Sequence, residues 1–204
     1  MRVALTFDDG PSKWTPPLLD ILDKEDVKAT FFVCGSSVTT ANGRILKRAH
    51  KAGHEVGNHT MTHPNLDRST KRAVLEELAD CSALLYEVLG VAPKVYRPPY
   101  LKDSMVAQAV GEALGMVSVG ADVIGYDWQE SNSLNIATSM RGDTFDGAVL
   151  LLHDGRPPGQ PPYAEGGSLD SRSHSLEAVM LLVPELKKRG YEFVTCSELL
   201  LVSA

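Results

Sequence analysis

The stretch MRVALTFDDGP, residues 1–11, indicates the fold expected of the rest of the chain. Residues 1–7 are mostly apolar and stop abruptly at Asp8, Asp9, Gly10 and Pro11, which is typical of a buried strand that runs into a loop. Two adjacent carboxylates at the end of a buried strand are costly to desolvate unless a cation or hydrogen bonds compensate. Asp, Gly and Pro are also ordinary turn formers, so alone these residues favour a functional site and a simple turn about equally.

Strand-like and helix-like segments alternate outward from this stretch to the end of the chain. Apolar runs at residues 29–33, 54–57, 94–96, 116–120, 148–152 and 191–194 indicate further strands, about seven in all, with segments of helical period between them. This alternation predicts parallel pairing through right-handed crossovers, so a doubly wound sheet and a (β/α) barrel are the candidate α/β folds. A full eight-unit barrel takes about 250 residues, and the 204 residues here suit a reduced one.

The composition is that of an ordinary soluble domain, with 43% hydrophobic and 23% charged residues. The formal net charge is -6 and no basic run occurs, so we expect no nucleic acid partner. No apolar stretch reaches the roughly 18 to 20 residues that cross a bilayer. Three scattered cysteines do not suit a disulfide framework. We expect a single domain over residues 1–204 that acts as a monomer.

The segment HTMTH places two imidazoles, His59 and His63, four residues apart. One turn of helix would set both on one face, where they could hold one metal ion, although an isolated pair also fits two solvent-facing histidines at a helix start. Taken with Asp8 and Asp9, the economical interpretation makes one aspartate a third metal ligand and leaves the other free as a base. Two histidines and one carboxylate leave coordination positions open for water and substrate, as a catalytic site requires.

The same ligand set also suits a non-haem iron oxygenase. Such enzymes usually carry the histidine and the carboxylate two residues apart on a double-stranded β-helix, whereas this sequence separates them widely and alternates strand with helix. A hydrolytic metal site is therefore favoured. The absence of a G-x-S-x-G segment disfavours a serine hydrolase.

Other polar residues follow predicted strands, where α/β folds collect their functional groups. His153 ends an apolar run and is either a candidate general acid or a polar residue that closes a strand. Arg97 precedes two prolines that stiffen the turn, which would direct the guanidinium toward a carboxylate or a backbone N–H toward an oxyanion. Asp127 could orient His153, and Trp128 could form a wall that faces sugar or packs in the core.

Five segments, in this order, resemble the motifs of the polysaccharide deacetylases, the NodB-like domains of carbohydrate esterase family four. The segments are Thr6-Phe7-Asp8-Asp9-Gly10-Pro11, His59-Thr60-Met61-Thr62-His63, Arg97-Pro98-Pro99-Tyr100, Asp127-Trp128 and Leu151-Leu152-His153. The resemblance implies a distorted (β/α) barrel with about seven parallel strands. It also implies a metal-dependent hydrolase that removes acetyl groups from N- or O-acetylated sugars, with zinc as the expected metal and cobalt as the alternative.

The resemblance assigns the metal site and the base by position. Asp9, His59 and His63 would bind the metal, and Asp8 would be the general base, held in place by Arg97. A metal in that position would polarise the acetyl carbonyl and lower the pKa of its bound water, while Asp8 takes a proton as water attacks.

The resemblance also assigns the acid and the pocket. His153 would be the general acid, tuned by Asp127, and would protonate the leaving amine or alcohol. The backbone N–H of Tyr100 would share the oxyanion with the metal, and Trp128 and Leu151 would line the acetyl pocket.

One residue differs from the family pattern, and one long segment lies outside the five motifs. The family usually carries an acid three residues before Asp127, and this chain has Ile124 there, so we expect different contacts from that loop to the substrate. The proline- and glycine-rich residues 154–173 follow His153 directly and exceed the usual loop length. We hypothesise that they shape the sugar subsites.

The particular acetylated glycan stays open, since acetylxylan, chitooligosaccharide and the glycan of peptidoglycan all suit the resemblance. A metal-dependent C–N hydrolase of a small molecule would share the ligands and is the alternative. A catalytically inactive carbohydrate-binding relative is disfavoured because ligands, base and acid are all present. Because the family's substrates are polymers, we expect a secreted or cell-surface enzyme that is a domain of a larger protein. A cytoplasmic enzyme is the alternative, because no signal peptide is present.

Overall fold

Eight parallel strands form the centre of the molecule, which a computed structural model describes over residues 1–157, 159 and 171–201. The strands are β1 (Arg2–Asp8), β2 (Thr30–Val33), β3 (Glu55–Asn58), β4 (Val95–Tyr96), β5 (Val117–Ser118), β6 (Val123–Ile124), β7 (Val149–His153) and β8 (Glu192–Val194). The α-helices are α1 (Thr15–Glu25), α2 (Thr40–Lys51), α3 (Lys71–Leu89), α4 (Met105–Ala113), α5 (Ser133–Asp143), α6 (Ser173–Lys188) and α7 (Cys196–Leu200). Short 3₁₀ helices are η1 (Gly35–Ser37), η2 (Leu66–Arg68) and η3 (Pro99–Leu101).

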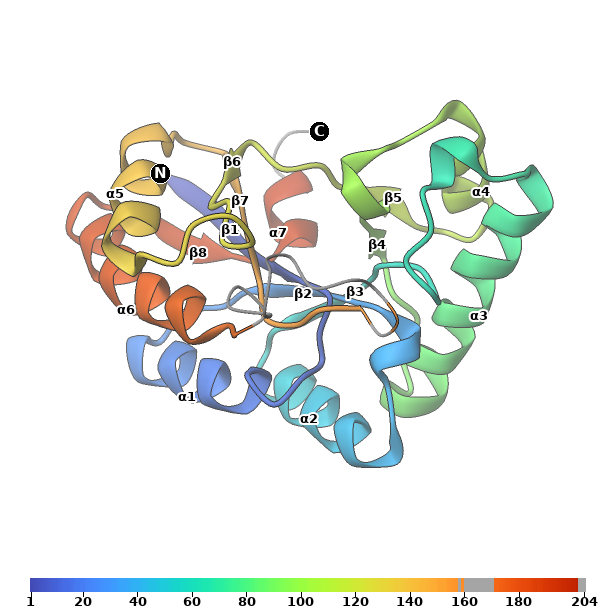
Figure 1. The fold of residues 1–204 in the computed structure, drawn as a ribbon, viewed down its shortest axis with the longest axis horizontal. Coiled ribbons are helices and arrows are strands. Elements are labelled where there is room, and N and C mark those ends of the chain that lie inside the picture. The colour runs from blue at the N-terminus through green and yellow to red at the C-terminus, as the bar shows by residue number, and fades with distance from the viewer. Residues whose placement is uncertain (158, 160–170, 202–204) are drawn as a thin grey trace.

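The sheet is built around β1 and curls into a half-barrel (Figure 1). The strand order is β5-β4-β3-β2-β1-β7-β6. One edge of β1 pairs with β7, and the other edge pairs first with β8 and then with β2. All these pairings are parallel, so the expectation of an α/β fold with a distorted, reduced barrel is confirmed.

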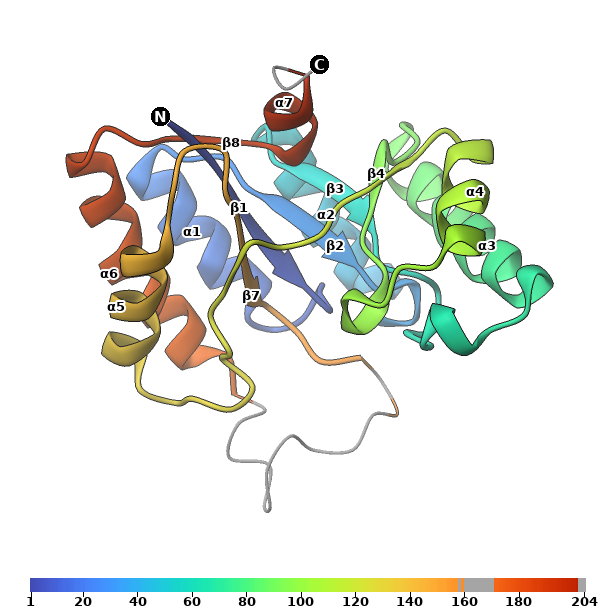
Figure 2. The same cartoon turned by 90° about the horizontal axis from the view of Figure 1, so that it is seen from above.

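Helices α1 to α6 lie on the outer side of the curled sheet, and α7 lies at the end where the strands begin (Figures 1 and 2). Alternate residues of β1 point to opposite faces, as strand geometry requires. Val3, Leu5 and Phe7 belong to the main core with α1 and α6. Ala4 belongs to a smaller core inside the barrel. Asp8 is four residues after Ala4, so its side chain points to the same face of β1 as that of Ala4. Its carboxylate is therefore directed into the barrel rather than under the helices.

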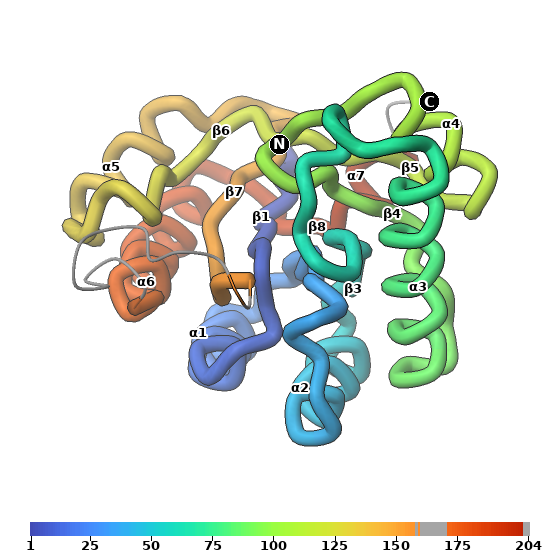
Figure 3. The backbone as a smooth tube through the Cα atoms, turned by 45° about the vertical axis from the view of Figure 1, so that its right-hand side comes forward, coloured from blue at the N-terminus to red at the C-terminus, as the bar shows by residue number. Residues whose placement is uncertain are grey.

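The carboxyl ends of the strands lie at the end of the molecule opposite the chain's N-terminus and α7 (Figure 2). The tube in Figure 3 shows β1 with β7 on one side and β3 on the other, all in the same layer. The register of β1 against β7 sets Asp8 beside His153. The pairing of β3 with β4 joins Asn58 to Tyr96, and His59 and Arg97 follow these two residues directly. The parallel register therefore brings the candidate residues to one edge.

One strand was missing from the sequence expectation. β6 is short and follows β5 with no helix between them, so it falls outside the alternation of strand and helix on which the expectation rested. It pairs with β7 at the edge of the sheet, four residues of chain after β5, which forms the opposite edge. The connection between β5 and β6 therefore spans the open side of the half-barrel.

The residues proposed to shape sugar subsites, 154–173, lie largely outside the described part of the chain, since 158 and 160–170 are not described. Within the described residues, no helix combines the length and the apolar character that crossing a membrane demands. The three cysteines, Cys34, Cys81 and Cys196, are buried free thiols.

Candidate active site

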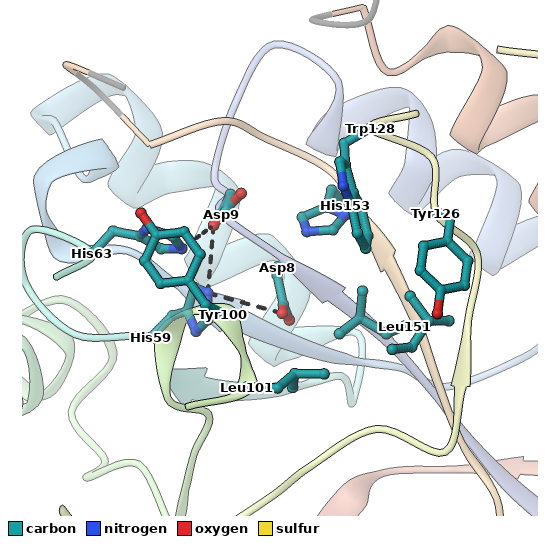
Figure 4. Close-up of a pocket in the computed structure, with 11 residues that line it drawn as sticks. Asp8, Asp9, His59, His63, Tyr100, Leu101, Tyr126, Trp128, Leu151 and His153 are labelled. Atoms are coloured by element: carbon teal, nitrogen blue, oxygen red, sulfur yellow. Dashed lines mark ion pairs between the residues drawn. The ribbon is translucent and has the colours of Figure 1, made fainter. Parts of the chain in front are cut away.

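A pocket of about 450 Å³ opens at the carboxyl ends of the strands (Figure 4). The residues that line it are Asp8, Asp9, His59, His63, Tyr100, Leu101, Ile124, Tyr126, Trp128, Leu151 and His153. In Figure 4, Asp9 and the two histidines lie on one side of the pocket, His153 and Trp128 lie on the other, and Asp8 lies between them. The structure thus gathers the pocket residues expected from sequence, and Arg97 and Asp127 lie fully buried behind them.

Asp9, His59 and His63 form a compact, buried cluster that fits a divalent cation. One ligand atom from each lies within 4.8 Å of the other two. The Nε2 atoms of both histidines lie 3.4 Å from Asp9 Oδ1. Two ligands at about 2.0 to 2.1 Å from a tetrahedral zinc ion are about 3.3 to 3.4 Å apart, so the observed spacing matches atoms that share one metal. Only three protein ligands converge among the described residues, which leaves room for water and substrate.

The two histidines reach the cluster from a loop, not from the helical turn that their spacing predicted. The segment after β3 is irregular, and Thr60 and His63 adopt left-handed backbone with φ of 67° and 63°. The Thr60 N–H donates to Asn58 Oδ1 at 2.7 Å, and the His63 N–H donates to Thr60 Oγ1 at 3.0 Å. Glu77 of α3 accepts both the backbone N–H and the hydroxyl of Thr62. These bonds hold a strained turn that directs both imidazoles toward Asp9.

Hydrogen bonding and charge set the protonation of the cluster. His59 donates Nδ1–H to the carbonyl of Arg97 at 2.8 Å, which leaves Nε2 facing Asp9, the arrangement usual for metal-binding histidines. Burial would raise the pKa of Asp9, but the hydrogen bond with His59 and the charges of His153, His59 and His63 lower it below its usual range. Burial lowers the pKa of His63 to about 4. The carboxylate and the neutral imidazole are the forms that bind metal.

Asp8 is held by a fully buried arginine. Arg97 donates from Nη1 to Asp8 Oδ1 at 2.8 Å and to Thr6 Oγ1 at 2.7 Å. Its remaining donors reach the carbonyls of Val119 and Gly120, in the connection between β5 and β6. The guanidinium also lies 4.2 Å from the centroid of the Phe32 ring. Arg97 therefore links Asp8 to the connection that spans the open side of the half-barrel, and it fixes the Asp8 carboxylate in place.

Across the pocket, His153 and Asp127 form a buried hydrogen-bonded pair. His153 donates Nδ1–H to Asp127 Oδ1 at 2.7 Å, and its backbone N–H donates to Oδ2 at 2.9 Å. Burial lowers the pKa of His153, but the charge and hydrogen bond of Asp127 outweigh it and raise the pKa above the usual range. Burial raises the pKa of Asp127, but mainly the charge and hydrogen bond of His153 bring it down to about 2. Trp128 contacts the His153 ring edge-on, with centroids 5.1 Å apart.

The pocket walls are mostly apolar and aromatic. Tyr100 and Tyr126 are both about half exposed, at 54% and 52%, and both adopt positive φ. The Tyr100 ring packs edge-on against His63, and Tyr126 packs against Trp128. Ile124 lines the wall at the position where the family that the motifs resemble usually carries an acid. Sequence reasoning missed Leu101 and Tyr126, because nothing in local periodicity marks an exposed loop residue as part of a pocket.

Asp154 is a buried carboxyl packed against the loop that follows β1 and carries Asp9. Its Oδ2 accepts from the Thr15 hydroxyl at 2.5 Å, and its backbone carbonyl accepts from Ser12. Its Oδ1 has no hydrogen-bond partner among the described residues. A Cβ on Gly10 would lie 2.4 Å from Asp154 Oδ2, so a side chain at that position would displace the Asp154 carboxyl group. Burial, with some effect of Asp9 and Asp8, raises the pKa of Asp154 to about 7.

Asp154→Asn is expected to reduce the loss of stability that the metal-free protein undergoes as the pH rises from 5 to 8. Because the folded-state pKa of Asp154 is raised from 3.8 to about 7, folding favours its protonated form. The resulting stability is complete below about pH 4 and is lost as the pH rises through about 7. We expect the free energy of unfolding to fall between pH 5 and pH 8 in both proteins. The fall should be smaller in the variant than in wild type by at least about 1 kcal/mol. Denaturant titrations at both pH values measure this, and equal losses would contradict it.

The fold and the site together define a parallel half-barrel that carries a candidate metal site at the carboxyl ends of its strands. The polysaccharide deacetylase family matches residues 1–119. A chitooligosaccharide deacetylase of Bradyrhizobium sp. (strain ANU 289) is 36% identical over 192 residues, which are 93% of this chain and 86% of that protein. A family 4 acetyl xylan esterase from Clostridium thermocellum, solved in complex with a cobalt ion, has a TM-score of 0.85 and 34% identity, and the match covers 99% of this chain and 91% of that one.

This chain belongs to the polysaccharide deacetylase family, as its motifs indicated. The peptidoglycan-N-acetylglucosamine deacetylase PgdA of Listeria monocytogenes is 36% identical over 199 residues, which are 97% of this chain. The chain spans only 38% of the length of that relative.

Proposed function

We propose that this domain removes acetyl groups from an N-acetylated or O-acetylated glycan by metal-dependent hydrolysis. The observation that carries the proposal is one pocket in which the cluster of Asp9, His59 and His63 faces His153, with Asp8 between them. A metal ligand set, a base held by arginine and an acid held by aspartate are the parts that such a hydrolysis needs. The Bradyrhizobium and Listeria relatives are deacetylases of chitooligosaccharide and of peptidoglycan N-acetylglucosamine, which favours N-acetylglucosamine as the target sugar.

The metal is proposed to be zinc, with cobalt as the alternative, and its ligands are Asp9, His59 and His63. The set of two nitrogen ligands and one oxygen ligand suits zinc, and the Clostridium relative holds cobalt. When bound, a divalent cation polarises the acetyl carbonyl and lowers the pKa of a coordinated water.

Asp8 is the general base in this proposal. Its Oδ1 accepts from Arg97, which leaves Oδ2 on the side of His59, 3.8 Å from His59 Nε2. Oδ2 is therefore the oxygen placed to take a proton from the attacking water beside the metal cluster. Arg97 is a positioning residue, because it is fully buried behind the pocket and reaches the site through its hydrogen bond to Asp8.

His153 is the general acid, and Asp127 positions it. The Nδ1–H bond to Asp127 fixes the ring so that Nε2 is left for the leaving nitrogen or oxygen of the sugar. The raised pKa of His153 favours the protonated imidazole, which is the form that a general acid needs. The backbone N–H of Tyr100 contributes to binding the developing oxyanion, and Trp128 and Leu151 hold the acetyl group.

The pocket walls suit a neutral sugar rather than a polyanion. Among the described residues that line the pocket there is no lysine or arginine, and the exposed rings of Tyr100 and Tyr126 offer flat apolar surfaces to a sugar. We propose that the domain acts as a monomer on a cell-wall or extracellular glycan, as a part of a longer protein. The Listeria relative, in which the match covers 38% of the length, supports that arrangement.

Acetate release from chelated and metal-restored protein tests the proposal. We expect chelation to lower turnover of chitooligosaccharide by at least about 10²-fold, because the carbonyl loses its Lewis acid, and zinc or cobalt to restore it. Acetylxylan and peptidoglycan glycan complete the panel, and we expect chitooligosaccharide or peptidoglycan to be the better substrate. Failure of all three glycans with both metals would refute the proposed function.

A further inference from the structure

The first turn of α6 contacts Asp127 with three buried side chains. Ser175 donates its hydroxyl to Asp127 Oδ2 at 2.6 Å. His174 donates Nε2–H to the Asp127 backbone carbonyl at 2.6 Å, and Arg172, at the N-cap, donates to the same carbonyl at 3.2 Å. The exposed fractions of Arg172, His174 and Ser175 are 0%, 6% and 0%. Figure 2 shows this end of α6 beside the segment that leads from β6 to α5.

These contacts complete the hydrogen bonding of the Asp127 side chain. Oδ1 accepts from His153 Nδ1–H, and Oδ2 accepts from the His153 backbone N–H and from the Ser175 hydroxyl. Of these three donors, only Ser175 lies outside the β7 strand end. It therefore fixes the rotation of the carboxylate plane from a second direction, and that rotation decides whether Oδ1 points at the imidazole.

We propose that Ser175 is a positioning residue for the general acid, acting through Asp127. The proposal rests on the proposed function, in which His153 protonates the leaving group. Without the hydroxyl, the carboxylate can rotate about its side-chain bonds, and the imidazole of His153 loses its fixed orientation. A misplaced acid costs turnover while leaving substrate binding intact. Ser175 lies 48 residues beyond Asp127 in the sequence, so helix packing alone brings the two together.

Ser175→Ala, with Ser173→Ala as the matched control, tests this role. Ser173 lies in the same turn, but its hydroxyl contacts only Ser171 among the described residues. On N-acetylated chitooligosaccharide we expect Ser175→Ala to lower kcat by about tenfold to a hundredfold, within the range that a general acid contributes, with KM changed less than about twofold. On 4-nitrophenyl acetate, whose phenolate departs without a proton, we expect less than about a twofold change. Ser173→Ala should leave both rates unchanged.

The two substrates separate positioning from general damage. Equal losses on both substrates would show that Ser175 only supports the fold, and no loss on the glycan would show that it does not act on His153. Either result overturns the proposal.

A second measurement needs no glycan turnover. In the ¹⁵N-labelled zinc-loaded protein, we expect the His153 Nδ1 proton to exchange faster with water in Ser175→Ala than in wild type or Ser173→Ala. Equal exchange in all three proteins would overturn the role of Ser175. Absence of acetate release by the wild type would instead refute the proposed function, and the exchange measurement would then still decide the role of Ser175.

Discussion

Replacing Asp8 with asparagine is expected to abolish deacetylation while leaving the metal bound. Asparagine keeps the shape of the side chain and can still accept from Arg97 through Oδ1, but it cannot take a proton from water. The three metal ligands are other residues, so their cluster stays intact. We expect kcat to fall by about 10³-fold or more, within the range that removal of a general base produces.

Acetate release and metal titration of the same preparation check this prediction. Zinc should bind Asp8→Asn and wild type with similar affinity. The variant also removes the charge of Asp8, which lies 2.8 Å from the fully buried guanidinium of Arg97, so its melting temperature must be measured and the assay run well below it. Turnover within tenfold of wild type would show that another group serves as base.

Replacing Asp9 with asparagine is expected to remove the metal and the activity together. Asp9 supplies the only anionic ligand of the cluster, and its Oδ1 faces the Nε2 atoms of both histidines at 3.4 Å. We expect zinc affinity to fall by more than the 10- to 100-fold that loss of an outer hydrogen-bond partner of a ligand costs. Turnover at limiting zinc should fall by about 10³-fold or more.

The same substitution, aspartate to asparagine, is thus expected to have different effects on zinc binding at the two neighbouring positions. Isothermal titration with zinc should separate them, since we expect Asp8→Asn to keep its binding isotherm and Asp9→Asn to lose it. Metal-free melting temperatures of the two variants control for damage to the fold. Wild-type zinc affinity in Asp9→Asn, or lost affinity in Asp8→Asn, would reverse the assignment of ligand and base.

Much of the fold follows from local sequence. The apolar run of residues 1–7 and the alternation after it correctly indicated parallel strands in a reduced barrel. Strands and helices bury regular faces, so their period appears in the chain itself. β6 was missed because it follows β5 without a helix between them, which breaks the alternation. The turn of His59 and His63 was wrongly expected to be helical, because spacing alone does not distinguish a helical turn from a loop held by Asn58 and Glu77.

The candidate metal ligands, base and acid were all present in sequence motifs, and only the tertiary structure decided how they face one another. The sequence determined which groups could act, namely paired aspartates at a strand end, two histidines four apart and one histidine closing a run of leucines. The packing decided that Arg97 joins Asp8 to the β5–β6 connection on the open side of the barrel. It also decided that Ser175 reaches Asp127 from α6. These contacts join residues between 22 and 89 positions apart, and a local sequence pattern records which face a side chain takes but not which distant side chain it meets.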